Sequence, residues 1–259
     1  MKVCINFSAL TNNIKPDEIK FRYRDRKSIT TFPDEPTIIL DCYDIKELDW
    51  EEIKRINILT KEKLVLCVDN IKLAEEAKKH NIKWYLGYSI SSYYDLNGLL
   101  ALSPTYIRIN GPLFFDIEKV KNKAKKFDVL IRHTPNVAFS DGLSHWPGYS
   151  GTWIHPNHLY LYEDYIDVIE FEDCDAKKEE TLYNIYINQK SWPTSLSVLI
   201  SNLDISSTSG IGRMITPEMT IARLKCRQIC EAGGKCQICS RALAIADADR
   251  FEKLLAPAT

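Results

Sequence analysis

The chain has 259 residues, of which 45% are hydrophobic and 27% are charged, and its formal net charge at pH 7 is −1. Such a chain is long enough for one large globular domain or two small ones, and its composition is ordinary for a soluble protein. The balance of basic and acidic residues excludes a global field that would attract nucleic acid or an anionic membrane, so any such partner would have to meet a local patch.

The amino-terminal residues "MKVCINFSAL" contain a short apolar run that the polar stretch "TNNIKPDE" ends at once. This run is too short for the apolar region of a secretion signal. The chain also lacks a run of roughly 18 apolar residues, the length needed to span a bilayer. Eight cysteines without a secretion signal favour a reducing compartment. We therefore expect a cytoplasmic protein without a membrane partner.

Short apolar runs alternate with amphipathic patterns along most of the chain. The runs predict strands at 2–7, 20–24, 37–42, 63–68, 83–88, 106–110, 128–133, 167–171 and 196–201. The patterns between them predict helices at 45–56, 71–81, 115–127 and 176–189. This alternation indicates parallel βαβ units and an α/β fold. We expect a TIM-like (β/α)8 barrel, which need not be regular, in preference to an open doubly wound sheet, because the glycine-rich nucleotide-binding motifs of open sheets are absent.

The carboxyl-terminal part of the chain has a different pattern. Thr216 can cap a helix whose first residue is Pro217, and Gly233 and Gly234 can end it. A second helix is predicted from Ser240. We therefore predict a barrel domain over residues 1–210 and a helical extension over residues 211–259.

Four of the eight cysteines lie in this extension, as Cys226, Cys230, Cys236 and Cys239. The first two are four residues apart on one helix and share a face, and the last two form a C-x-x-C pair after a Gly-Gly turn. Four such thiolates can bind a structural zinc ion or a [4Fe–4S] cluster. We favour zinc, since a closed set of four protein ligands suits a structural site, and the sequence leaves the iron–sulfur cluster open.

Polar residues follow the apolar strands at the ends that form the active face of a (β/α)8 barrel. They supply candidate acids, bases and anion-binding groups for catalysis and two candidate substrate-binding groups. The catalytic candidates are Asp41, Asp69, Arg108, Arg132, His133 and Glu170, and the binding candidates are Tyr88 and Asn110.

The segment 132–158 holds four of the five histidines and two tryptophans in a long connection. Long connections of this kind in compact domains are usually functional. We expect Trp146, Trp153 and His155 to contact substrate, with the aromatic rings stacking on a base or another aromatic group.

The stretch "GTWIHPNHLYLYEDYIDVIEFED" resembles a late barrel segment of the collagenase-like peptidase (U-32) family, and "LSPTYIRINGPLFFDIEKVKN" at 102–122 resembles one of its barrel units. The resemblance covers about 60–175. It implies a TIM-like barrel with four cysteines on an iron–sulfur cluster and the hydroxylation of RNA or of small aromatic precursors. The family's arginine and acidic pair are replaced here by His155, Asn157 and His158, and its preceding cysteines are absent.

Three functions follow as alternatives. The first is an iron–sulfur enzyme that modifies RNA or a small aromatic molecule. The second is a non-catalytic scaffold or binding protein with a structural zinc, whose partner is a small molecule, RNA or protein. The third is a hydrolase or peptidase with Asp41, Asp69, Glu170 and His133 as acid–base groups, although no familiar hydrolase motif is present.

Overall fold

A computed structural model describes residues 1–10, 14–29, 36–109, 112–133, 154, 156–171 and 176–188. The predicted strand at 196–201, the helical extension at 211–259 and its four cysteines lie outside these ranges. The division of the chain at residue 210 therefore stays a prediction.

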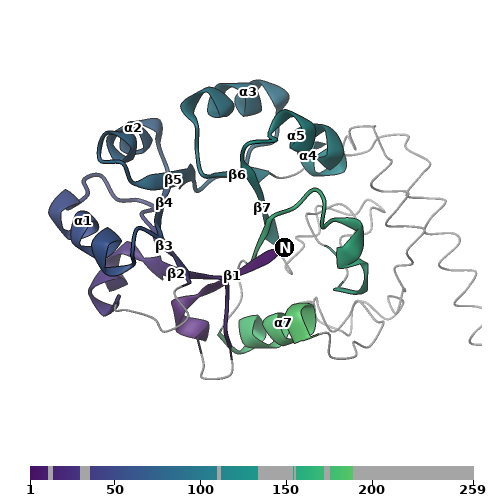
Figure 1. The fold of residues 1–259 in the computed structure, drawn as a ribbon, viewed down its shortest axis with the longest axis horizontal. Coiled ribbons are helices and arrows are strands. Elements are labelled where there is room, and N and C mark those ends of the chain that lie inside the picture. Colours follow the sequence, from purple (N-terminus) through teal and green to yellow (C-terminus); the bar gives the residue numbers. More distant parts are fainter. Residues whose placement is uncertain are drawn as a thin grey trace, which may run out of the picture.

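Eight parallel strands form one sheet that curves into a nearly closed barrel (Figure 1). The strands are β1 (Lys2–Asn6), β2 (Glu18–Arg22), β3 (Thr37–Asp41), β4 (Leu64–Val68), β5 (Lys83–Leu86), β6 (Tyr106–Ile109), β7 (Asp128–His133) and β8 (Val168–Phe171). Their order in the sheet is β5-β4-β3-β2-β1-β8-β7-β6, so strands adjacent in sequence are adjacent in space and β1 pairs with β8. The predicted α/β barrel is confirmed at this level.

Strands β5 and β6 meet where the two ends of the sheet come together. The Thr105 amide donates to the Trp84 carbonyl at 2.7 Å, and the Ile90 amide donates to the Arg108 carbonyl at 2.8 Å. A parallel bridge also joins Ile90 to Ile109. These contacts bring the free edges of β5 and β6 together, and this junction is called the seam below.

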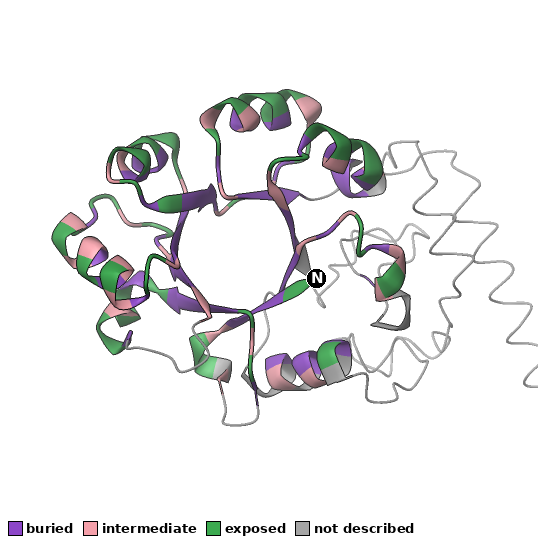
Figure 2. Cartoon of the chain, viewed as in Figure 1, coloured by how far each residue is buried: buried purple, intermediate pink, exposed green. Residues whose placement is uncertain are grey.

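Helices surround the ring of strands on the outside (Figure 1). They are α1 (Trp50–Leu59), α2 (Ile71–Lys79), α3 (Tyr93–Leu102), α4 (Pro112–Phe115), α5 (Ile117–Lys123) and α7 (Ala176–Asn188). Short 3-10 helices occur at Phe7–Ala9, Tyr23–Ser28 and Pro156–Leu161. Figure 2 shows that the strands are largely buried and that the helices expose their outer faces.

Side-chain caps decide where several helices begin. The Asp49 carboxylate accepts from the Glu52 amide at 3.1 Å, and Asp44 has a φ of 60°, so α1 begins at Trp50 and not at the predicted residue 45. Helix α3 was not predicted, because its sequence lacks a clear polar face. Its start is set by Ser92, whose hydroxyl accepts from the Asp95 amide at 3.1 Å.

Two other predicted boundaries were wrong. The predicted strand at 20–24 is β2 at Glu18–Arg22, because the chain enters a 3-10 helix at Tyr23. The predicted helix at 115–127 is α5 at Ile117–Lys123, and Asp116, whose backbone leaves the helical conformation, separates it from α4.

The alternation of side chains along each strand produces two separate apolar clusters. The larger one fills the space between the sheet and the helices and includes Ile19, Phe21, Leu66 and Ile169. The smaller one lies inside the barrel and consists of Cys4, Ile39, Val65, Cys67, Tyr85, Tyr106, Leu130 and Val168. Polar residues occupy the inward-facing positions beyond the small cluster, toward each of the two ends of the barrel.

Across the described ranges of the chain, no helix has both the length and the apolar character needed to cross a membrane.

Candidate functional site

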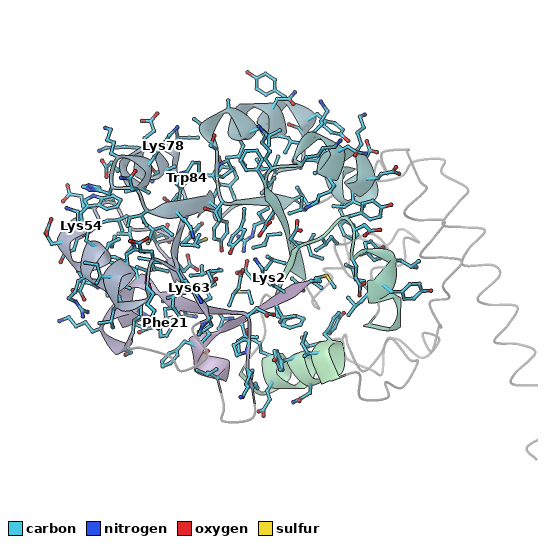
Figure 3. The ribbon with its side chains drawn as sticks, in the orientation of Figure 1. Lys2, Phe21, Lys54, Lys63, Lys78 and Trp84 are labelled. Carbon is cyan, nitrogen blue, oxygen red and sulfur yellow. The ribbon has the colours of Figure 1, made fainter. Side chains whose placement is uncertain are left out.

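Strand β2 carries two charged side chains into the barrel interior. Its sequence alternates Glu18, Ile19, Lys20 and Phe21, and the two apolar residues belong to the outer core. Glu18 and Lys20 therefore face inward, where both are buried. Figure 3 shows nitrogen- and oxygen-bearing side chains gathered inside the ring of strands. The barrel interior thus has an apolar middle between two polar ends.

At the carboxyl ends of the strands, Lys20 joins two carboxylates. Its Nζ lies 2.5 Å from Glu170 Oε1 and 3.1 Å from Asp41 Oδ2. The side chains of Lys20 and Glu170 are 8% and 3% exposed, and that of Asp41 is 24% exposed. Burial lowers the pKa of Lys20, but the charge of Glu170 raises it further and leaves it above its usual value. Lys20 is therefore a permanent ammonium group at neutral pH.

Arg108 approaches the same carboxylate from β6. Its Nη2 pairs with Glu170 Oε2, and its Nη1 donates to the Gly87 carbonyl. Burial again lowers the pKa and Glu170 raises it, with the net result that the pKa of Arg108 lies above its usual value. Lys20, Asp41, Arg108 and Glu170 are called the mouth cluster below. It contains two cations and two carboxylates, and three of its four members are almost inaccessible to solvent.

Gly87 is required where Arg108 reaches the backbone. A Cβ at this position would lie 2.9 Å from Cys67 Sγ, which is closer than real Cβ contacts. The absence of a Cβ therefore lets the chain after β5 lie close to the Cys67 thiol, and the Gly87 carbonyl at this point accepts from Arg108.

A further buried carboxyl, Glu179, comes to this end of the barrel from α7. Its Oε1 accepts from the Asn6 backbone amide at 2.5 Å, and its Oε2 accepts from Asn6 Nδ2 at 3.1 Å. Burial raises the pKa of Glu179 to about 7, although the Asn6 hydrogen bonds oppose this. Since Asn6 pairs in register with Lys20, Glu179 lies next to the mouth cluster as a group that can gain or lose a proton near neutral pH.

The amino-terminal end of the barrel is built differently. Glu18 Oε1 accepts from the Tyr106 hydroxyl at 2.7 Å, and no cation contacts the buried carboxyl among the described residues. Burial raises the pKa of Glu18 to about 7. The ion pair at this end, between Lys2 and Asp128 at 3.3 Å, is exposed.

The mouth cluster brings together three of the residues predicted from the sequence, namely Asp41, Arg108 and Glu170. Asp69 does not join them, because its carboxylate accepts from the Asp44 amide at 3.1 Å and from Asn70 Nδ2 at 2.7 Å. Tyr88 lies just beyond β5 and is 47% exposed.

The other predicted residues are placed only in part or not at all. Arg132 and His133 lie on β7, where their backbones pair in register with Glu170 and Phe171. The remaining predictions lie outside the described residues: Asn110, Trp146, Trp153, His155, Cys226, Cys230, Cys236 and Cys239.

The described part of the chain contains no group of three or more histidine, cysteine or acidic side chains placed to hold a metal. Its three cysteines, Cys4, Cys42 and Cys67, are buried free thiols. Burial raises the pKa of each thiol, which keeps them protonated and weakly reactive.

Sequence reasoning missed Lys20, Asn6 and Glu179. A signal for Lys20 was present, because a lysine between Ile19 and Phe21 in a strand covered by helices must face the barrel interior. Glu179 carried no such signal, since it lies in a helix rich in lysine and glutamate.

Comparison with known protein families finds none that matches the chain. Comparison with curated proteins finds no relative either. Among solved structures, the chain is similar to a protein described as a cube-shaped, highly porous cage designed by fusing symmetric oligomeric domains. The TM-score is 0.42 and the identity 8%, over 98% of this chain and 83% of that one.

Proposed function

We propose that the chain is an enzyme that binds a small polar molecule at the carboxyl ends of the barrel strands and acts on it with the mouth cluster. The observation that carries this proposal is the position of Lys20, whose ammonium group lies between Glu170 and Asp41 inside the barrel. The active sites of (β/α)8 barrels lie at this end of the strands.

The burial of the cluster supports a functional role. Removing charges from water costs several kcal/mol per ion, and a well-packed set of apolar side chains is often as stable as a buried ion pair or more so. The barrel interior is already apolar at its middle, where Ile39, Val65 and Leu130 pack together. The fold therefore does not need Lys20, Arg108 and Glu170 for packing, and a chemical task accounts for them better.

The mouth cluster supplies fixed charges, and the neighbouring Glu179 supplies a titrating group. Lys20 and Arg108 stay positive and would stabilise negative charge that develops on a substrate oxygen. Lys20 does not serve as an amine nucleophile, because its raised pKa keeps it protonated. Asp41 is the most exposed member and can meet an incoming ligand first. Glu179, with a pKa of about 7, is the group suited to move a proton.

Of the substrate classes expected from the sequence, the geometry favours a small molecule over RNA. The charged groups lie within the barrel, and three of the four are nearly inaccessible. RNA recognition relies on exposed aromatic and basic surface. Hydroxylation by an iron–sulfur enzyme, hydrolysis and a scaffold role remain predictions from the sequence, and no contact in the described residues favours one of them.

A metabolite screen tests the proposed function. Purified protein is incubated with a mixture of small polar metabolites, and mass spectrometry follows which compounds are consumed. We expect conversion by the wild type, loss of conversion in Asp41→Asn, and unchanged conversion in the control Glu51→Gln, whose carboxylate is exposed on α1. In Glu179→Gln, the limb of the pH–rate profile near pH 7 should disappear. Equal conversion by Asp41→Asn and the wild type would overturn the proposal.

The predicted metal site in the carboxyl-terminal extension has a separate test. Zinc and iron are measured in protein purified without oxygen, together with the visible spectrum. One zinc per chain would support a structural site on Cys226, Cys230, Cys236 and Cys239, and about four irons with a broad brown absorption would support a [4Fe–4S] cluster. The absence of both metals would refute the prediction.

A further inference from the structure

Besides Glu18 Oε2 at the amino-terminal end, two buried hydrogen-bond donors inside the barrel have no partner among the described residues. They are Nε of Arg108 and the hydroxyl of Tyr85. Both side chains are almost completely buried, with 2% of Arg108 and 0% of Tyr85 exposed. Buried polar groups in native proteins are nearly always paired, so each exception calls for an explanation.

The two groups come from strands that meet at the seam. Tyr85 is on β5 and Arg108 on β6, and the guanidinium carbon of Arg108 lies 5.9 Å from the centre of the Tyr85 ring. The other nitrogens of the guanidinium are occupied, Nη2 by Glu170 and Nη1 by the Gly87 carbonyl. These two bonds fix the plane of the guanidinium and leave its Nε–H as a donor that is held in place without an acceptor in the described part of the chain.

A neighbouring tyrosine shows that the fold can satisfy such a hydroxyl. The rings of Tyr85 and Tyr106 lie edge to face at 5.4 Å, and both belong to the small interior cluster. The Tyr106 hydroxyl donates to Glu18 at 2.7 Å, whereas the Tyr85 hydroxyl has no partner in the described part of the barrel. Of these two tyrosine hydroxyls, the described residues thus pair that of Tyr106 and leave that of Tyr85 without a partner.

We propose that Arg108 Nε and the Tyr85 hydroxyl bind the carbonyl oxygen of the substrate, as a pair of donors at the side of the mouth cluster. This inference rests on the proposed function. It narrows the substrate class to small aldehydes and ketones, including keto acids.

The charge of the site favours a carbonyl oxygen as the acceptor. The mouth cluster already balances its two cations with two carboxylates, so no full negative charge is needed for neutrality. A carbonyl oxygen is neutral when bound and becomes partly negative as a proton leaves the adjacent carbon or as a nucleophile adds. Two fixed donors and the nearby Arg108 charge stabilise this change more than they stabilise the ground state.

The first test needs no ligand and compares two tyrosines. Tyr85→Phe removes a hydroxyl that none of the described residues pairs, so the urea midpoint of the free protein should stay the same or rise. Tyr106→Phe removes a paired hydroxyl and leaves Glu18 without its donor, so the midpoint should fall. A fall in Tyr85→Phe as large as that in Tyr106→Phe would show that the Tyr85 hydroxyl has a structural partner, and it would overturn the inference.

The second test measures selectivity for the carbonyl group. The probes are three-carbon pairs that differ in one carbonyl, namely pyruvate with lactate and dihydroxyacetone with glycerol. For at least one pair, the wild type should bind the carbonyl member more tightly, by about tenfold or more, since each hydrogen bond contributes about tenfold. Tyr85→Phe should reduce this preference by about tenfold, because Arg108 Nε remains, whereas the control Tyr94→Phe, on an exposed side chain, should keep it in full. A wild type without any carbonyl preference would overturn the inference.

The outcomes separate this inference from the proposed function. If a screened compound is converted in a manner that requires Asp41 but not the Tyr85 hydroxyl, the active site stands and the carbonyl-binding role is refuted. If Asp41→Asn converts every compound as the wild type does, the proposed function itself fails.

Discussion

Both ends of the barrel interior contain a buried glutamate, and the two are held in opposite ways. Glu170, at the carboxyl ends of the strands, contacts the ammonium of Lys20 and the guanidinium of Arg108. Glu18, at the amino ends, contacts the hydroxyl of Tyr106, and burial raises its pKa to about 7. One carboxylate is thus paired with permanent cations, and the other is a weak acid that can be neutral.

The difference shows which end is built for stability and which end is built to hold charge. A carboxyl that can take up a proton reduces the cost of its burial, so Glu18 is compatible with a purely structural role. At the other end, Lys20, Arg108 and Glu170 keep three charges buried. Apolar side chains at these positions would stabilise the fold equally well. The same chemical group is therefore paired with a neutral hydroxyl at one end of the barrel and with permanent cations at the other.

The largest expected effect comes from removing the charge of Glu170. Glu170→Gln leaves two buried cations without their shared carboxylate, and this should lower the free energy of unfolding by about 3–5 kcal/mol. Urea denaturation at pH 7 measures it. The matched control is Glu18→Gln, which removes a carboxyl without a cationic partner among the described residues and should cost much less. Equal losses in the two variants would remove the contrast between the two ends.

The pH dependence of stability should come from Glu18 together with Glu179. The folded-state pKa of Glu18, about 7, is above the usual glutamate value of 4.5. Its protonated form is thus favoured by folding, and the associated stability is complete below pH 4.5 and is lost as the pH rises through 7. For Glu18 the loss is roughly 3 kcal/mol. Urea midpoints between pH 5 and 8 should fall less steeply in Glu18→Gln than in the wild type, and parallel curves would contradict this.

A methyl group added at Gly87 should disturb only the end of the barrel that is formed by the carboxyl ends of the strands. Its carbon would meet Cys67 Sγ at 2.9 Å, so Gly87→Ala should cost about 1–3 kcal/mol through overpacking. Thermal unfolding measures the loss. Adding Cys67→Ala provides room for the methyl group, so the double variant should lose less than the two single changes combined. Strict additivity would show that the two residues do not touch.

The smallest effect is expected for the exposed lysine at the amino ends of the strands. Lys2 pairs with Asp128 at 3.3 Å, and both side chains are more than a third exposed. Lys2→Met should therefore change the free energy of unfolding by about 0–1 kcal/mol. Lys20→Met, which leaves Glu170 and Asp41 without their shared cation, should cost several times as much. Similar losses for the two lysines would mean that burial does not distinguish the two ends.

The sequence predicted the barrel and part of its site because both follow from alternation along the chain. Apolar strands covered by helices predicted the parallel sheet, and strand ends predicted Asp41, Arg108 and Glu170. The position of a strand relative to a following 3-10 helix is not a matter of alternation, and this is why β2 was placed two residues too late. The alternation around Lys20 was visible only once Glu18 and Ile19 were counted as part of the strand. Glu179 was missed for a different reason, because its contact with Asn6 joins residues 173 positions apart in the chain.

A structure of the protein with a compound from the metabolite screen would test the central claim most directly. We predict that the compound lies at the carboxyl ends of the strands, within hydrogen-bonding distance of Lys20, Asp41 or Arg108. A compound bound beside Glu18 at the opposite end, or outside the barrel, would contradict it.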